Sequence, residues 1–166
     1  TEGDEVEDLF MLLKKVKQQF PQVTAVLSGA ILSNYQRTRV ENVCMRIGLT
    51  PLAYLWQRDQ MQLTTDMIAS GIDATIGKVA CLGLQAKHVG RPLKEVLPHL
   101  RDLHAQFGVH VAGEGGEYET LTLNSPLHYH QIVIDEAKAI TTDEDDCAPV
   151  VLLSIARAHL RPKKDL

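Results

Sequence analysis

The stretch that decides the fold is LKEVLPHLRDLHAQFGVHVA, residues 93–112. Leucine and valine recur in it every three or four residues as far as Phe107, which predicts a helix with one buried face. Gly108 suits the left-handed position that ends a helix, and the apolar run 109–112 then predicts a strand. A helix, a glycine and a strand therefore follow one another directly.

The same order occurs twice more upstream of this stretch. Helices are predicted over 37–47 and 60–68, and they are followed by Gly48 and Gly71. Apolar runs at 49–56 and 72–82 come next, and an earlier helix over 6–20 precedes a run at 23–32. This alternation is typical of an α/β layer with a mainly parallel sheet, in which ligands bind beyond the carboxyl ends of the strands.

The remainder of the chain has a different pattern. Strands are predicted over 118–123, 130–134 and 149–160, with an acidic loop at 143–146 and no convincing helix between them. We therefore expect an α/β domain over residues 1–112 and a smaller, β-rich lobe over residues 113–166.

Composition excludes several classes of protein. With 166 residues, 45% of them hydrophobic, the chain can bury a core. Seventeen Lys and Arg against 21 Asp and Glu give a net charge of −4, which argues against a nucleic-acid partner. The apolar runs are shorter than the roughly 20 residues that cross a membrane. Three widely spaced cysteines without a C-x-x-C pair indicate a reducing compartment.

The segment GEGGEYET, residues 113–120, is the strongest candidate site. Its glycines, Gly113, Gly115 and Gly116, could present backbone N–H groups to an anion. Its carboxylates, Glu114, Glu117 and Glu119, repel one another unless a cation, a metal or a proton lies between them. A solvated turn is the alternative, but a position directly after the strand at 109–112 favours a ligand site.

Two further features could bind an anion. The loop 28–36 leads into a helix whose N-cap is predicted at Ser33 or Asn34, with Arg37 and Arg39 nearby, although from spacing alone simple capping with a solvated face is the better account. Lys78 interrupts an apolar strand, where it needs an acidic partner or a route to water. The histidines have no familiar ligand spacing, so no metal site is predicted.

Four strings in register carry a family resemblance: residues 2–9, 29–41, 51–56 and 113–120. Together they resemble the diphthamide synthetase (diphthine–ammonia ligase) family of N-type ATP pyrophosphatases. The resemblance implies a nucleotide α-hydrolase-like α/β domain followed by a smaller C-terminal lobe. The family's Ser-Gly-Gly-x-Asp-Ser pyrophosphate loop has no counterpart here, so we expect a chain truncated at its N-terminus and inactive alone.

The resemblance further implies a cytoplasmic ligase that uses ATP, with magnesium, to adenylate the carboxylate of diphthine on translation elongation factor two. Ammonia then displaces AMP to give the amide. The implied catalytic residues are Glu114, Glu117, Glu119 and Lys78. The implied ATP-binding residues are Gly29, Ser33, Asn34, Tyr35, Gln36 and Arg39, and the implied diphthine-binding residues are Gly113, Gly115, Gly116, Tyr118 and Trp56.

Several alternatives stay open at this point. The chain could be a non-catalytic interaction module for elongation factor or ribosome, or an adenylating ligase for a different carboxylate. The three glutamates could hold the quaternary ammonium of diphthine, or instead magnesium or ammonium. An exposed edge beside the strand at 23–32 would favour a homodimer.

Overall fold

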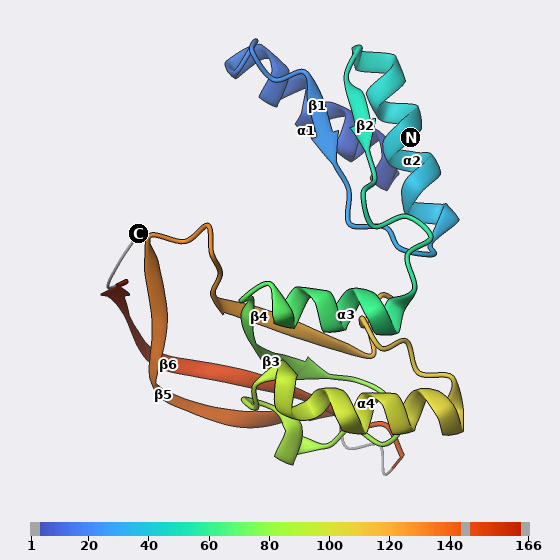
Figure 1. Ribbon diagram of the computed structural model, residues 1–166. Helices are drawn as coiled ribbons and strands as arrows, with labels where there is room; N and C mark the ends of the chain where they lie inside the picture. Colours follow the sequence, from blue (N-terminus) through green and yellow to red (C-terminus); the bar gives the residue numbers. More distant parts are fainter. Residues whose placement is uncertain (1–3, 144–146, 164–166) are drawn as a thin grey trace. The chain divides into compact units, whose positions relative to one another are not determined.

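The computed structural model describes residues 4–143 and 147–163 (Figure 1). The chain forms two compact units, residues 1–58 and 59–166. Residues 2 and 3 of the first family string, and 144–146 of the predicted acidic loop, lie outside the described residues. The observed division differs from the one expected at residues 112 to 113, because elements on both sides of that point share one sheet and one core.

The first unit contains two helices and a short parallel sheet. Its elements are α1 (Glu5–Gln19), β1 (Ala25–Leu27), α2 (Asn34–Ile47) and β2 (Thr50–Leu52). β1 and β2 pair in parallel, with Ala25 opposite Thr50, so the predicted parallel pairing is confirmed here. Both strands are shorter than the apolar runs that predicted them, and Ala30 and Ile31 of the first run are buried in the loop after β1 instead.

The two helices of this unit are joined by polar and apolar contacts. Arg46 on α2 donates to both carboxylate oxygens of Glu7 on α1, at 2.7 and 2.9 Å, and its guanidinium lies over the ring of Phe10. Val43 and Cys44 are buried on the inner face of α2. Gly48 ends α2 with φ +73°, the left-handed conformation that the sequence predicted.

The second unit is built on an antiparallel sheet. Its elements are α3 (Gln60–Ala69), β3 (Asp73–Val79), the 3-10 turn η1 (Ala86–His88), α4 (Leu93–Phe107), β4 (Tyr118–Asn124), β5 (His130–Asp143) and β6 (Val150–Pro162). The strand order is β4-β3-β6-β5, and every pairing is antiparallel. The three C-terminal strands are confirmed, and the described residues after 116 contain no helix.

The prediction of a parallel sheet was wrong for β3. The chain returns at the carboxyl end of this strand, where the Ala80 N–H donates to the Glu117 carbonyl at 2.9 Å, and β4 therefore runs the opposite way. The run 109–112 is not a strand either. Val109 and Val111 are buried, but the Val111 N–H donates to the side chain of Gln60 instead of a neighbouring strand.

The core of the second unit lies between β3 and α4. Ile76 and Val79 from β3 and Leu100 from α4 belong to one buried cluster, which also includes Val111 and Val151. These side chains are almost fully buried, so they fix the position of the segment that joins α4 to β4. No helix among the described residues is long and apolar enough to cross a bilayer.

Candidate functional site

The glycine-rich segment between α4 and β4 is a sequence of tight turns. The Gly113 N–H donates to the His110 carbonyl at 2.8 Å, and the Gly116 N–H donates to the Gly113 carbonyl at 3.1 Å. Both glycines have positive φ, +71° at Gly113 and +86° at Gly116. A Cβ on Gly113 would lie 2.9 Å from the Tyr118 carbonyl oxygen, so this position requires glycine for space as well as for conformation.

Glu117 and Glu114 both meet His110. One carboxylate oxygen of Glu117, Oε1, accepts the His110 backbone N–H at 3.0 Å. The Glu114 N–H donates to His110 Nδ1 at 3.3 Å, so a neutral ring carries its proton on Nε2. That Nε2 lies 3.8 Å from Glu114 Oε2, and both side chains are mostly buried, at 14% and 11% exposure. The N–H groups of Gly113 and Gly116, two of the three glycines in the predicted anion cradle, are therefore already bonded within the segment.

The second oxygen of Glu117 has no hydrogen bond. Glu117 Oε2 and His110 Nε2 are both buried atoms without a hydrogen-bond partner among the described residues. Burial, and then the charge of Glu117, raise the pKa of the Cys81 thiol and of the Tyr118 phenol. A carboxylate with a buried oxygen that lacks a hydrogen bond is poorly solvated, and this favours a cation beside Glu117.

Lys78 and Glu119 form a separate pair. They are cross-strand neighbours on β3 and β4, and Lys78 Nζ lies 2.9 Å from Glu119 Oε1. The Glu119 side chain is 62% exposed. The acidic partner that the sequence predicted for Lys78 is thus present, and it engages one of the three predicted glutamates.

Tyr118 lies in the core, which differs from its expected contact with a ligand. The residue is 5% exposed, and its hydroxyl donates to the Val111 carbonyl at 2.6 Å. Because the ring packs against Gly113, Tyr118 positions the glycine-rich segment and does not offer an aromatic face to a bound cation.

The predicted ATP-binding residues of the first unit gather at the start of α2. Ser33 is the N-cap and accepts the Gln36 N–H, as predicted, while Asn34 begins the helix. The Tyr35 hydroxyl donates to Glu5, and the Arg39 guanidinium lies over the Tyr35 ring and 3.6 Å from the same carboxylate. A cavity of about 280 Å³ adjoins this group and is lined by Glu5, Val6, Leu9, Ser28, Tyr35, Gln36, Arg39 and Val40.

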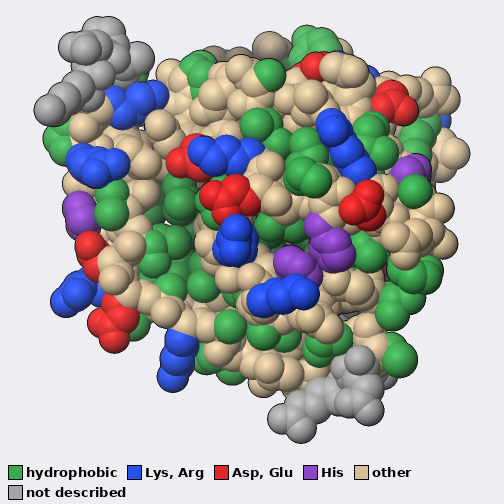
Figure 2. Space-filling model, turned by 60° about the horizontal axis from the view of Figure 1, so that its bottom comes forward, with side chains coloured by type: hydrophobic (Ala, Val, Ile, Leu, Met, Phe, Trp, Pro, Cys, Tyr) green, Lys and Arg blue, Asp and Glu red, His purple; other side chains and the backbone are tan. Residues whose placement is uncertain are grey.

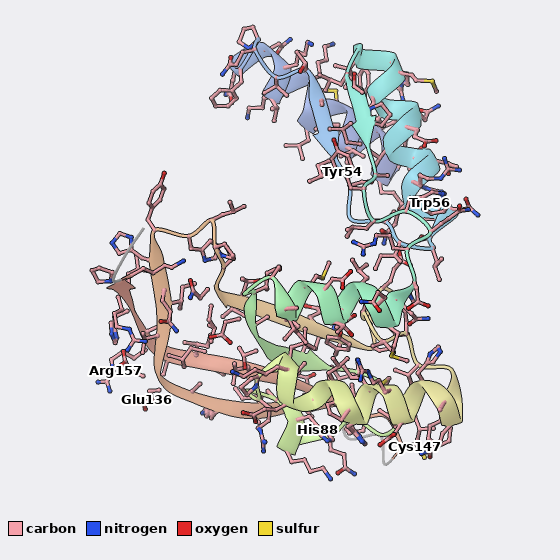
Figure 3. All side chains as sticks on the ribbon, viewed as in Figure 1. Tyr54, Trp56, His88, Glu136, Cys147 and Arg157 are labelled. Atoms are coloured by element: carbon pink, nitrogen blue, oxygen red, sulfur yellow. The ribbon has the colours of Figure 1, made fainter. Side chains whose placement is uncertain are left out.

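Gly29 and Trp56 belong to the same unit. A side chain at Gly29 would meet no atom within 4 Å, so its backbone is open on that side. Figure 3 shows Trp56 on the segment that follows β2. The Arg37 guanidinium lies 4.6 Å from the centre of the Trp56 ring, and one ring face therefore already contacts a cation.

Two residues that contact the glycine-rich segment or its neighbours were not predicted from the sequence. His110 contacts Glu114 and Glu117, and Gln60 accepts the Val111 N–H. His110 had a usable signal, because it is the polar residue of an apolar run that directly precedes the glycines. Gln60 had none, since its contact joins residues 51 positions apart. Across residues 4–143 and 147–163, no three His, Cys, Asp or Glu side chains gather as a metal site.

Comparison with known proteins defines the class. Residues 59–147 match the diphthamide synthase C-terminal domain, and residues 1–51 match the diphthamide synthase N-terminal domain. The chain belongs to the diphthamide synthase family.

Similar curated proteins carry one name. Diphthine–ammonia ligase of Mus musculus is 55% identical over 98% of this chain, and that of Homo sapiens is 52% identical over the same share. The Danio rerio protein of the same name is 50% identical over the whole chain and 65% of its own length. The chain spans 61% of the length of the mouse and human relatives.

Proposed function

We propose that the full-length protein is an ATP-dependent ligase that converts diphthine on translation elongation factor two to diphthamide. The diphthine carboxylate attacks the α-phosphorus of ATP, and pyrophosphate leaves. Ammonia then attacks the acyl carbon, AMP leaves with the carboxyl oxygen that attacked, and a proton is released. Family membership and the shared name of the similar proteins support this reaction.

ATP is assigned to the first unit. Ser33 caps α2, and Asn34, Tyr35 and Gln36 form its first turn, where the positive end of the helix dipole favours an anion. Arg39 adds a positive charge beside the cavity of this unit. These features suit a phosphate group, and magnesium would arrive with the nucleotide.

Diphthine is assigned to the glycine-rich segment of the second unit. The observation that carries this assignment is the buried Glu117 Oε2, which lacks a hydrogen-bond partner among the described residues. A quaternary ammonium cannot donate a hydrogen bond, and a carboxylate attracts it through charge alone. Glu114, which is also mostly buried, would add to the same field.

The same carboxylates could instead act on ammonia. In that case Glu117 and Glu114 would bind ammonium and take its proton before the amide forms, or they would hold magnesium. Glu119 is less suited to each of these roles than Glu114 and Glu117, because its side chain is exposed and already paired with Lys78.

The full-length variant Glu117→Gln separates the two roles. Glutamine keeps an oxygen for the His110 N–H and removes only the charge. We expect weaker binding of diphthine-bearing elongation factor, with unchanged affinity for ATP. Glu119→Gln is the matched control, because it removes the same charge from an exposed side chain, and it should bind the factor as the unsubstituted protein does. Unchanged binding of both substrates by Glu117→Gln, with slower amidation, would refute cation recognition and favour the ammonia role.

A further inference from the structure

A small basic pocket lies in the second unit, beside η1 and the first two turns of α4. Its volume is about 240 Å³, and it is lined by Lys87, His88, Arg91, Glu95, Val96 and His99. Figure 3 shows His88 near the start of α4, and Figure 2 shows histidine side chains beside Lys or Arg side chains on the face that it draws. We propose that this pocket binds a phosphate dianion, either inorganic phosphate or the phosphate of a small monoester.

Backbone contacts fix the protons of the two histidine rings. The Gln85 N–H donates to His88 Nδ1 at 2.9 Å, so a neutral His88 carries its proton on Nε2. His99 Nε2 lies 2.9 Å from the Gly83 carbonyl, which can only accept, so His99 carries a proton on that nitrogen. The rings stack with centroids 4.7 Å apart and planes 18° from parallel. His88 thus keeps an Nε2–H donor that no backbone group among the described residues accepts.

The pocket has an excess of positive charge. Lys87 has no hydrogen-bond or ion-pair partner within the part of the chain that the structure describes. Arg91 donates to Glu95 Oε2 through Nε and Nη2, at 3.0 and 2.7 Å, which leaves Nη1 as a further donor. Burial, and then the charges of His99, Lys87 and Arg91, lower the pKa of His88. Because Glu95 offsets Arg91, the unbalanced positive charge is that of Lys87, and an anion in the pocket would offset it.

The kind of anion follows from the donors. Lys87, His88 and Arg91 provide separate N–H groups, and each can donate a charge-assisted hydrogen bond to a different oxygen of one phosphate. A pocket of this size admits one phosphate group and a small substituent. The net charge of the chain, −4, disfavours a nucleic-acid backbone as the source of that phosphate.

Proton NMR of the 166-residue chain tests the site. The Hε1 resonance of His88, assigned with a His88→Gln variant, is followed while sodium phosphate replaces sodium chloride at constant ionic strength. We expect a saturable shift and a rise in the pKa of His88, because the bound anion stabilises the charged ring. A parallel titration with O-phosphoserine distinguishes the sources, since tighter binding than inorganic phosphate identifies a monoester.

Matched lysine variants locate the binding. Lys87→Gln should weaken phosphate binding about threefold to fivefold, the range for one partly solvated ion pair. Lys94→Gln, an exposed α4 position outside the pocket lining, should change it by less than about twofold. Far-UV circular dichroism checks that each variant folds. Equal effects of the two substitutions would overturn the proposal. A His88 Hε1 resonance that stays in place when phosphate replaces chloride would overturn it as well. Neither outcome bears on the proposed ligase reaction, which uses other residues.

Discussion

Gly113→Ala tests the geometry of the candidate site, because two separate costs meet at this residue. Its φ of +71° disfavours any residue with a Cβ. The added methyl group would also lie 2.9 Å from the Tyr118 carbonyl oxygen and 3.1 Å from the Tyr118 ring. Neither group can move easily, since Tyr118 is buried and pairs with Val79 in the sheet.

Gly108→Ala is the matched control. Gly108 has nearly the same φ, +73°, but a Cβ there would meet nothing within 4 Å. The left-handed conformation alone costs alanine about 1 kcal/mol, and overpacking costs about 1–3 kcal/mol. We therefore expect the free energy of unfolding to fall by about 1 kcal/mol in Gly108→Ala and by about 2–4 kcal/mol in Gly113→Ala.

Urea unfolding of the 166-residue chain, followed by circular dichroism at 222 nm, measures the difference between the two variants. Both substitutions lie in the second unit, so the same transition reports on them. Equal losses in the two variants would refute the argument, because they would show that the close approach of Tyr118 to Gly113 has no energetic weight.

Three other predictions concern the same unit and the thiols. Tyr118→Phe should lower the free energy of unfolding by about 1–2 kcal/mol by removing the bond to Val111, as measured by urea unfolding. Because burial raises the pKa of Tyr118 in the folded chain, its contribution is complete below the unfolded-state pKa of about 10 and is lost as pH rises further. The phenylalanine variant should lack that alkaline loss, and an identical pH profile would contradict this. A double-mutant cycle on Lys78 and Glu119 should give less than about 1 kcal/mol of coupling, because Glu119 is exposed, and a larger value would mean that solvent screens the pair poorly. A thiol reagent should modify exposed Cys147 first and buried Cys44 last, as peptide mapping can show, and the reverse order would contradict the burial described above.

Helix positions in this chain could be predicted from the sequence, but strand directions could not. The periodic leucines and valines predicted α4 correctly from residue 93 to 107. The apolar residues of a buried helix face recur every three or four positions, so the pattern is visible in the local sequence. The direction of β3 relative to β4 depends on where the chain re-enters the sheet after α4. Long-range contacts, such as the hydrogen bond from Ala80 to Glu117, determine that point. A helix, a glycine and a strand follow one another in the sequence in the same way whether the strand joins a parallel or an antiparallel sheet.

The candidate site was only partly predictable for the same reason. Three glycines and three glutamates within residues 113–119, directly after an apolar run, indicated this segment as the candidate. The pattern could not assign partners: Glu119 pairs with Lys78 on a neighbouring strand, while Glu117 turns toward His110. Tyr118 was expected at a ligand, because a sequence does not distinguish a buried aromatic ring from one that lines a site.

The most direct measurement is amide formation by the full-length protein. Purified protein is incubated with diphthine-bearing elongation factor two, ATP and isotopically labelled ammonium, and the modified peptide is analysed by mass spectrometry alongside the nucleotide products. The proposed function predicts labelled nitrogen in the diphthamide, with AMP and pyrophosphate formed in equal amounts to the amide. Formation of ADP in place of AMP, or an elongation factor that stays unamidated while ATP is consumed, would contradict it.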